Sequence, residues 1–512
     1  MSAFGGRFAG AVDLLRQPVR GAPGAGGAPE PRVPRWSPEL GDALLYAGAA
    51  LFAGVTAAVS TISLYRVWGW IALGPYLAAA IASLLVWRHR RVRSPSGGTP
   101  ALPATPELPE LAGSPGSASP PGTPGTPGTA GTSGRRRLGG ARIWILAGVL
   151  VGATLVPLGV EVSLRGNGPT AASAHVQPEV VVIDQAGTRL ARGQDPYHAQ
   201  VRGGHLVSAV PGEPAYESFF PYLPLMTLFG LPSSTRQPVQ VTDARIFFSL
   251  VTLVVAGAAL ILSSSPRRRR MRAAQVLVVL PTAALPLATG GDDMPVVALL
   301  LLAIVLAQRR RPGWSGLVLG VVSAMKFTAW PLAALALFCA RDRHGRRAPL
   351  WMLAGMAVVA VPVIVPFATT NPAAFLSNVV LFPLGLSGVA SPATSNLPGH
   401  LLTTAFPWMH TALPLVVGLA GLALLGRRLV RRPPATTSTV AYLAGWVMLV
   451  ALSFAPATRV GYLLYPFNFF VWGWMTSEKR RPAEEAEGAR AAEGAGGEDG
   501  ERARTLDPIL TA

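Results

Sequence analysis

The sequence has few charged residues, one cysteine and two lysines, and the first two of these shortages exclude classes of protein. Only 13% of the 512 residues are charged and 50% are hydrophobic, whereas roughly 25% are charged in an average soluble domain. A water-soluble fold could not bury so much apolar surface. The one cysteine, Cys339, lies in an apolar stretch and can form neither an internal disulfide nor a cysteine metal cluster. Lysine occurs only as Lys326 and Lys479, so arginine carries nearly all of the positive charge.

The net charge of +19 would suggest nucleic-acid binding in a soluble protein, so the position of the basic residues decides its meaning. They form short runs between apolar segments, at 88–93, 135–137, 267–272, 309–311, 341–347, 427–432 and 479–481. This is the positive-inside pattern of a membrane protein. No soluble module with interleaved aromatic residues accompanies the runs, so we expect no binding to nucleic acid.

Apolar stretches of about 20 residues, the length of a membrane-crossing helix, recur along the chain. Full spans are predicted at 42–64, 68–87, 142–161, 245–263, 349–367, 411–426, 439–455 and 459–475. Four shorter apolar pieces lie at 274–289, 294–308, 313–325 and 327–340. Because the last two are too short for full spans, we expect short or re-entrant helices that meet around Lys326. The sequence thus predicts an all-α polytopic protein of the cell membrane, with about 12 transmembrane helices and both termini cytoplasmic.

Composition divides the chain into five predicted parts. Residues 1–41 are a disordered cytoplasmic N-terminus without the apolar core of a cleavable signal, and residues 42–87 are a two-helix membrane unit. Residues 88–141 are a disordered cytoplasmic linker rich in Pro, Gly, Ser and Thr. Residues 142–475 form the main transmembrane module. Residues 476–512, charged and rich in Ala and Gly, form a disordered cytoplasmic tail.

With this topology, residues 162–243 form a long loop on the outer, non-cytoplasmic face. Loops longer than roughly 15 residues are usually functional or disordered, and the apolar and aromatic pieces of this one predict partial order, with helices at the membrane surface. Its acidic residues are Glu179, Asp184, Asp195, Glu213, Glu217 and Asp243. Asp184 follows an apolar run and is either the N-cap of a helix or a catalytic carboxylate. Asp195, before Pro196, is typical of a turn.

Other outer segments contribute further candidates. Asp292 and Asp293 lie in a glycine-flanked turn, where they either cap the next helix or contact a sugar or an ion. Lys326 lies between apolar stretches, and an ionisable group at membrane depth indicates function. A phosphate group would suit its compact positive charge. The alternative is a lysine whose side chain reaches the outer lipid headgroups. Arg459 either binds a lipid phosphate or anchors a span. Arg189 lies in the first outer loop, where the alternative to a functional role is an exposed surface charge.

Three segments resemble glycosyltransferase family 87, integral membrane enzymes of the GT-C type that use polyprenyl-phosphate sugars. They are IDQAGTRLARGQDPY at 183–197, FFPYLPLMTLFGLP at 219–232 and GGDDMPVVALLLLAIVLAQRRRPGWSGLVLGVVSAMKFTAWP at 290–331. The resemblance extends over about 140–475 and implies a GT-C-like fold. It does not explain the first two helices or the linker.

The resemblance also implies roles for single residues. Asp184 matches the family's proposed catalytic base, and Lys326 with Pro331 matches a helix that ends in Lys and Pro. Other matches are Gly193, Pro196 and Tyr197 in the loop element, Tyr222 and Pro224 in the next segment, and Asn396 in a later outer loop. The turn GGDDMP is more acidic than is usual in the family, and the last outer turn, TRVGYLLYP, stands where many of its mannosyltransferases carry a histidine. These departures leave the sugar and the acceptor open.

We therefore expect a hexosyltransferase that moves a sugar, such as mannose, from a polyprenyl phosphate to a lipid or cell-wall glycan on the outer face, with inversion. Because a lipid phosphate needs little protonation to leave, one carboxylate suffices as base, and cations stabilise the departing phosphate. Asp184 is the expected base. The expected donor-phosphate contacts are Lys326, Arg459 and Arg189, and the expected acceptor or sugar contacts are Asp292, Asp293, Asn396, His400, Tyr197 and Tyr222. No metal or other cofactor is expected.

Two other interpretations stay open at this point. A multi-span transporter or lipid flippase fits the number of spans, but such proteins are normally built from duplicated halves and the sequence has no internal repeat. A catalytically silent membrane scaffold would use the linker and the tail to recruit partners.

Overall fold

The computed structural model describes residues 37–93, 130–168, 170–197, 201–202, 205–206, 214–345, 347–389 and 391–477, and these residues are mostly helical. Eight of the described helices are long and apolar enough to cross a membrane. They cover Pro38–Val59 (α2), Ser63–Val92 (in α3), Gly140–Ser163 (α4, η1 and α5), Val239–Leu262 (α8 and α9), Arg267–Thr289 (α10, η4 and α11), Ala348–Thr370 (α15), Met409–Arg431 (α18) and Thr437–Phe454 (α19). The structure thus supports a polytopic membrane protein with eight long helices among the described residues.

The other four predicted crossings are short in the structure. They are α12 (Asp293–Gln308), α13 (Pro312–Ser323), the pair η5 (Phe327–Ala329) and α14 (Trp330–His344), and the pair η7 (Val460–Leu463) and α20 (Leu464–Thr476). The segment predicted as a full span at 459–475 is one of them, whereas the piece predicted to be short at 274–289 belongs to the long helix Arg267–Thr289. The predicted break around Lys326 is present, because this residue has extended backbone between α13 and η5. Most of the segments predicted to be disordered, at 1–41, 88–141 and 476–512, lies outside the described residues. Their described ends are partly helical, because α2 begins at Pro38, α3 extends to Arg93 and α4 begins at Ala130.

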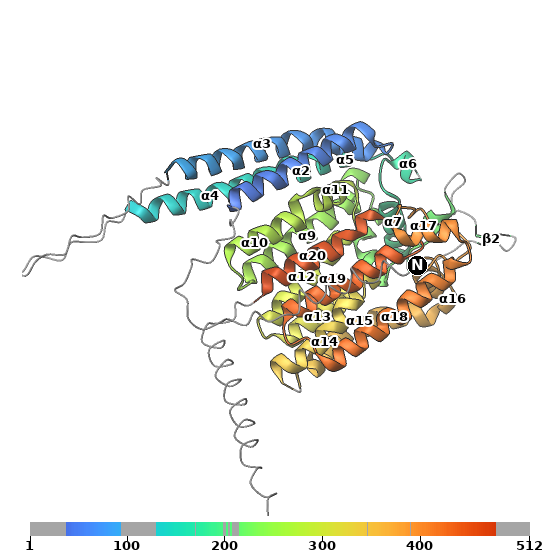
Figure 1. The fold of residues 1–512 in the computed structure, drawn as a ribbon. Coiled ribbons are helices and arrows are strands. Elements are labelled where there is room, and N and C mark those ends of the chain that lie inside the picture. Colours follow the sequence, from blue (N-terminus) through green and yellow to red (C-terminus); the bar gives the residue numbers. More distant parts are fainter. Residues whose placement is uncertain are drawn as a thin grey trace, which may run out of the picture.

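Helices α2 (Pro38–Val59) and α3 (Ser63–Arg93) form an N-terminal hairpin that packs along the main module (Figure 1). The two helices cross so closely that a side chain at Gly69 would lie 2.7 Å from the Ala53 carbonyl oxygen. On the other side of α3, the Trp68 indole donates a hydrogen bond to the Ala153 carbonyl oxygen at 3.0 Å. The two-helix unit is therefore an integral part of the bundle.

A buried acidic residue joins the start of this hairpin to the module. The Asp42 carboxylate lies 2.6 Å from Arg142 Nε in α4 (Ala130–Leu150) and 2.8 Å from Arg272 Nη1 in α10 (Arg267–Ala274). The Gln275 amide, in η4 (Gln275–Val279), donates to Asp42 at 3.1 Å and to the Tyr46 hydroxyl at 3.0 Å. A buried carboxylate is stable only with such partners, so these contacts determine the position of α2.

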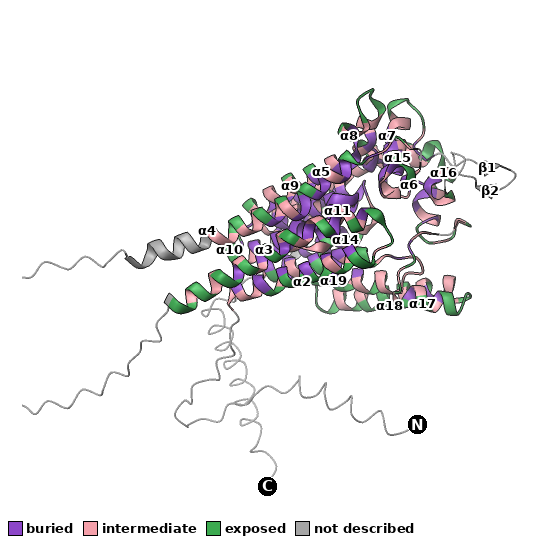
Figure 2. Ribbon diagram, turned by 90° about the horizontal axis from the view of Figure 1, so that it is seen from above, coloured by how far each residue is buried: buried purple, intermediate pink, exposed green. Residues whose placement is uncertain are grey.

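Short helices of two long loops gather at one end of the bundle, which we call the loop face. The elements of the first loop are α6 (Ala171–Ala174), α7 (Pro178–Ala191), the two-residue strands β1 (Val201–Arg202) and β2 (His205–Leu206), η2 (Ala215–Ser218), η3 (Pro224–Ser234) and α8 (Val239–Thr242). The second loop contains α16 (Pro372–Leu376), η6 (Ser377–Leu381) and α17 (Pro398–Ala405). Figures 1 and 2 both place α6, α7, α16 and α17 at this end and the arginine-rich α10 at the other.

Helix α12 occupies the middle of the bundle and packs against α9 (Ala244–Leu262) and α13. Most of its side chains are buried, as the purple interior of Figure 2 illustrates. Its N-terminus follows α11 (Pro281–Thr289) through a sharp turn in which Gly290 has a φ of 123°, a backbone conformation that favours glycine. The turn places Asp292 and Asp293 at the loop face.

Candidate active site

A cavity of about 820 Å³ lies at the loop face between segments that are far apart in the sequence. Its polar walls come from the start of α7, the turn before α12, the loop near residue 394 and the turn that leads into η7. Its apolar walls come from the hairpin of α2 and α3, from α11 and from α20. The charged residues that line it are Glu179, Asp292, Asp293 and Arg459. The size and the mixed lining are typical of a site for a small molecule.

Glu179 and Arg459 form an ion pair across this cavity. Glu179 lies in the first turn of α7, directly after Pro178, and its Oε1 is 2.5 Å from Arg459 Nη1. Its second carboxylate oxygen is buried and accepts no hydrogen bond from any described residue. Burial by itself would lower the pKa of Arg459, but the Glu179 carboxylate raises it above its ordinary value. The guanidinium therefore stays charged.

The turn that carries Arg459 is held in place by the second loop. Thr458 donates a backbone hydrogen bond to the Ala393 carbonyl oxygen at 2.9 Å and accepts one from the Ser395 amide at 3.0 Å. The Ser395 hydroxyl in turn accepts a hydrogen bond from the Val460 amide at 3.0 Å. These contacts determine how far Arg459 projects into the cavity.

Asp292, Asp293 and Lys326 form a second charged cluster beside this pair. Lys326 Nζ lies 2.7 Å from Asp292 Oδ2 and 2.6 Å from Asp293 Oδ1. The Tyr465 hydroxyl donates a further hydrogen bond to Asp293 at 2.5 Å. Asp292 is the N-cap residue of α12, but its side chain makes no capping hydrogen bond. The two carboxylates border the cavity, whereas Lys326 lies behind them and is not part of its lining.

The charges of this cluster depend on one another. Burial raises the pKa of Asp292 to about 7, although Lys326 lowers it, and the neighbouring Asp293 adds to the rise. Burial by itself would lower the pKa of Lys326, but the two carboxylates raise it above its ordinary value. Lys326 is therefore charged at neutral pH. A lysine buried in this way does not reach the headgroups, so that alternative is wrong.

The aromatic segment at 219–224 holds Lys326 in place. Leu223 and Leu225 donate backbone hydrogen bonds to the carbonyl oxygens of Met325 and Ala324, at 3.0 and 2.9 Å. The Tyr222 ring lies 5.1 Å from Lys326 Nζ, within the range of a cation–π contact. Tyr222 therefore contacts the lysine without being part of the cavity lining.

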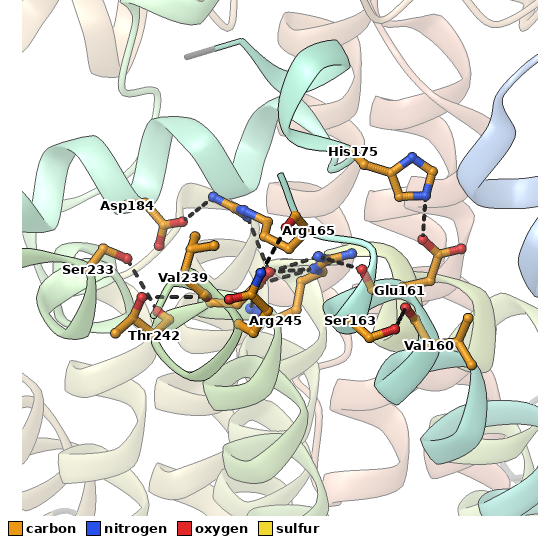
Figure 3. A network of polar contacts seen from close by, with 12 residues as sticks. Val160, Glu161, Ser163, Arg165, His175, Asp184, Ser233, Val239, Thr242 and Arg245 are labelled. Carbon is orange, nitrogen blue, oxygen red and sulfur yellow. Dashed lines mark hydrogen bonds and ion pairs between the residues drawn. The ribbon is translucent and has the colours of Figure 1, made fainter. Parts of the chain in front are cut away.

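Asp184, the predicted base, lies in a different charged network (Figure 3). Its carboxylate accepts a hydrogen bond from Arg165 Nη2 at 2.9 Å, and Arg165 Nη1 donates to Asp243 at 3.2 Å. Asp243 also accepts hydrogen bonds from Arg245, at 2.7 Å from Nη2. Burial raises the pKa of Asp184 to about 7, although Arg165 lowers it, and Asp243 adds to the rise.

The geometry of α7 explains why Asp184 does not line the cavity. The helix begins at Pro178, with Gln177 as its N-cap, so Asp184 is in mid-helix and the N-cap alternative is wrong. At about 100° per residue, five positions turn Asp184 roughly 140° away from Glu179. On the face near Asp184, α7 packs against η3 so closely that a side chain at Gly230 would lie 1.9 Å from a backbone oxygen of α7. A role of Asp184 as base stays a prediction, and the geometry favours Glu179.

The remaining predicted contacts are not part of the cavity lining. The buried Tyr197 donates a hydrogen bond from its hydroxyl to the Tyr222 carbonyl oxygen at 2.9 Å, so it supports the loop. Arg189 contacts the Pro196 carbonyl oxygen at 3.5 Å. Asn396 is exposed, and His400 Nδ1 lies 3.1 Å from the Pro456 carbonyl oxygen. The roles of these residues in binding sugar, acceptor or phosphate stay predictions.

Glu179 and Tyr462 are two cavity residues that were not candidates from the sequence. Glu179 was one of several acids in the first loop, and its place after Pro178 is typical of the first turn of any helix. Tyr462 stands 5.7 Å from Lys326 Nζ, in the turn after Arg459. Among the described residues, no group of three or more His, Cys, Asp or Glu side chains is placed to hold a metal ion.

Comparison with known proteins identifies the central part of the chain. Residues 220–453 match the family described as glycosyltransferase family 87. The match includes Asp292, Asp293 and Lys326, whereas Glu179 and Arg459 lie outside it. No curated protein and no solved structure matches the chain. Residues 220–453 therefore carry a glycosyltransferase family 87 domain, which together with the apolar helices indicates a membrane glycosyltransferase.

Proposed function

We propose that the chain transfers a sugar from a polyprenyl-phosphate donor to a lipid or glycan acceptor in the cavity at the loop face. Mannose is one candidate for the sugar. The observation that carries the proposal is the pairing of Glu179 with Arg459 across a cavity that also has apolar walls. The reaction needs a carboxylate that accepts the proton of a hydroxyl group and a cation that binds the phosphate. It also needs an apolar surface that contacts the lipid chain.

The proposed reaction is a single displacement at the anomeric carbon. The acceptor hydroxyl loses its proton to the Glu179 carboxylate as its oxygen bonds to the anomeric carbon. The bond from that carbon to the phosphate oxygen breaks, and the lipid phosphate leaves with the electron pair. One displacement inverts the configuration, and a single general base suffices because the phosphate leaves without protonation.

Arg459 is the proposed contact for the phosphate. It lines the cavity with 27% of its side chain exposed, whereas the side chain of Lys326 is 11% exposed behind two carboxylates. A planar guanidinium presents several donors to a phosphate and stabilises the charge that develops there as the bond breaks. Lys326 holds Asp292 and Asp293, and we assign to these two acids the hydroxyl groups of the sugar or of the acceptor.

The orientation in the membrane follows from charge. The arginines of α10 and the end of α18 (Met409–Arg431) lie at the end of the bundle opposite α17. Cytoplasmic loops of membrane proteins carry an excess of arginine and lysine. We therefore propose that the loop face is the outer face and that both termini are cytoplasmic.

Transfer assays with defined donors test this function. Membranes that contain the wild-type chain should transfer label from a radiolabelled polyprenyl-phosphate sugar to a lipid or glycan acceptor, and Glu179→Gln should strongly reduce the rate of this transfer. Vesicle uptake of the sugar lipid without transfer would favour a transporter or flippase instead. Equal transfer by the wild type and Glu179→Gln would remove Glu179 as the base, and a loss confined to Asp184→Asn would restore Asp184 to that role.

A further inference from the structure

The N-terminal hairpin of α2 and α3 has a place in the cavity that its position in the sequence does not suggest. It precedes the residues that match the family, at 220–453. Nevertheless, it contributes a continuous strip to the cavity wall, made of Phe52, Val55, Thr56, Val59, Ser60, Ile62, Leu64 and Tyr65. This strip is mostly apolar.

The hairpin is fixed to the polar part of the site at its tip. The Gln177 amide donates hydrogen bonds to the Tyr65 hydroxyl at 3.0 Å and to the Thr289 hydroxyl at 2.9 Å. Gln177 is two residues from Glu179, and Thr289 is three residues from Asp292. A single amide therefore joins the hairpin to both carboxylate-bearing segments, so the apolar strip has a defined position relative to the charged residues.

The cavity is amphipathic along its length. Arg459 and three carboxylates lie at one part of its wall, and Leu285 and Phe467 face the cavity together with the hairpin residues Phe52 and Val55. Val55 is 52% exposed and Phe52 is 48% exposed, so the apolar part is open to its surroundings in the membrane-spanning length of α2. An anionic head with a long apolar chain matches this distribution of charge.

We propose that the hairpin, opposite α11 and α20, forms the groove that receives the isoprenoid chain of the donor, and so selects donors by their lipid chain. The inference rests on the proposed function, because it takes the phosphate of the same donor to lie at Arg459. Lipid tails are as apolar as these side chains, so transfer of the chain from the bilayer into the groove gains little from hydrophobic burial. The groove acts instead by orientation, because it aligns the anomeric carbon with Glu179.

A bulky substitution in the groove tests the proposal. Val55→Trp should obstruct the chain, and Ile81→Trp is the matched control, since Ile81 lies on α3 outside the cavity lining and is 59% exposed. Each variant would be assayed with two donors that carry the same sugar, one with a geranyl chain and one with a long polyprenyl chain. The ratio of kcat/KM for the long donor to that for the short donor should fall by about tenfold or more in Val55→Trp. It should keep its wild-type value in Ile81→Trp.

Photo-crosslinking gives a measurement that does not depend on turnover. A polyprenyl phosphate with a diazirine in its chain should label peptides from residues 52–65 in the wild type and in Glu179→Gln, and much less in Val55→Trp. An unchanged ratio of donors in Val55→Trp, or labelling confined to other helices, would overturn the groove while leaving the proposed function in place. A ratio that depends on the chain of the acceptor lipid would assign the groove to the acceptor and also overturn the proposal. Absence of transfer from both donors in the wild type would contradict the proposed function itself.

Discussion

Helix α7 carries two carboxylates with different surroundings, Glu179 with 15% of its side chain exposed and Asp184 buried. Glu179, at its start, pairs with Arg459 and borders the cavity, whereas Asp184, five residues later, pairs with Arg165 in an ion network outside the cavity lining (Figure 3). Each carboxylate has one buried oxygen without a hydrogen-bond partner among the described residues. Burial and an arginine partner are therefore not enough to indicate catalysis. What separates the two acids is access to a space that a substrate can occupy.

Neutralising each acid in turn tests which of the two is the catalytic base. Glu179→Gln removes the proposed base but keeps its shape, so the rate of transfer should fall by about 10² to 10⁴-fold. Asp184→Asn should keep the rate within a few-fold of the wild type, because its carboxylate does not border the cavity. Initial rates with saturating donor measure both effects, and thermal unfolding shows that each variant is folded. The reverse result would assign catalysis to the network and not to the cavity.

The arginine of the network should matter for stability. Arg165→Met leaves Asp184 buried without its cation, while Asp243 keeps Arg245, and breaking a buried pair in this way costs about 3 to 5 kcal/mol. The decrease should be measured as a lower free energy of unfolding in detergent.

The matched control is the double variant Arg165→Met with Asp184→Leu. It removes the unpaired charge and should recover part of the lost stability. If the single and double variants were equally stable, Asp184 would not depend on Arg165 for compensation.

The arginine of the cavity should matter for transfer. Arg459→Lys keeps a positive charge but replaces the planar fork by a point charge. Loss of one hydrogen bond to a phosphate should lower kcat/KM for the donor by roughly tenfold, with little change in unfolding because the side chain is partly exposed. Arg165→Lys is the matched comparison and should leave kcat/KM near the wild-type value. A larger kinetic effect from Arg165→Lys would place the phosphate at the network.

The sequence predicted the apolar helices well, because length and hydropathy alone decide whether a helix can cross a membrane. It also indicated Asp292 and Lys326 as candidates, the first because it lies in a glycine-flanked turn on the outer face and the second because it lies between apolar stretches. It could not show that these two contact each other, because they are 34 positions apart and belong to different helices. Nor could it show which face of α7 borders the cavity, so the resemblance directed attention to Asp184. The inclusion of α2 and α3 in the wall depends on tertiary packing alone.

The last prediction concerns the pH dependence of stability and tests the surroundings of Asp184 without an assay of activity. The pKa of Asp184 is raised by burial from an ordinary value near 3.8 to about 7, so between these values the folded protein binds the proton more tightly than the unfolded chain. The resulting stability is complete below about pH 4 and is lost as the pH rises through 7. One such group changes the free energy of unfolding by at most about 1.4 kcal/mol per pH unit.

Thermal unfolding from pH 5 to pH 8 should therefore show a steeper decline in the wild type than in Asp184→Asn. Because Asp292, whose pKa is also raised to about 7, is present in both proteins, its contribution cancels in the difference. Identical slopes would mean that Asp184 stays ionised across this range, held by Arg165 more strongly than its burial opposes.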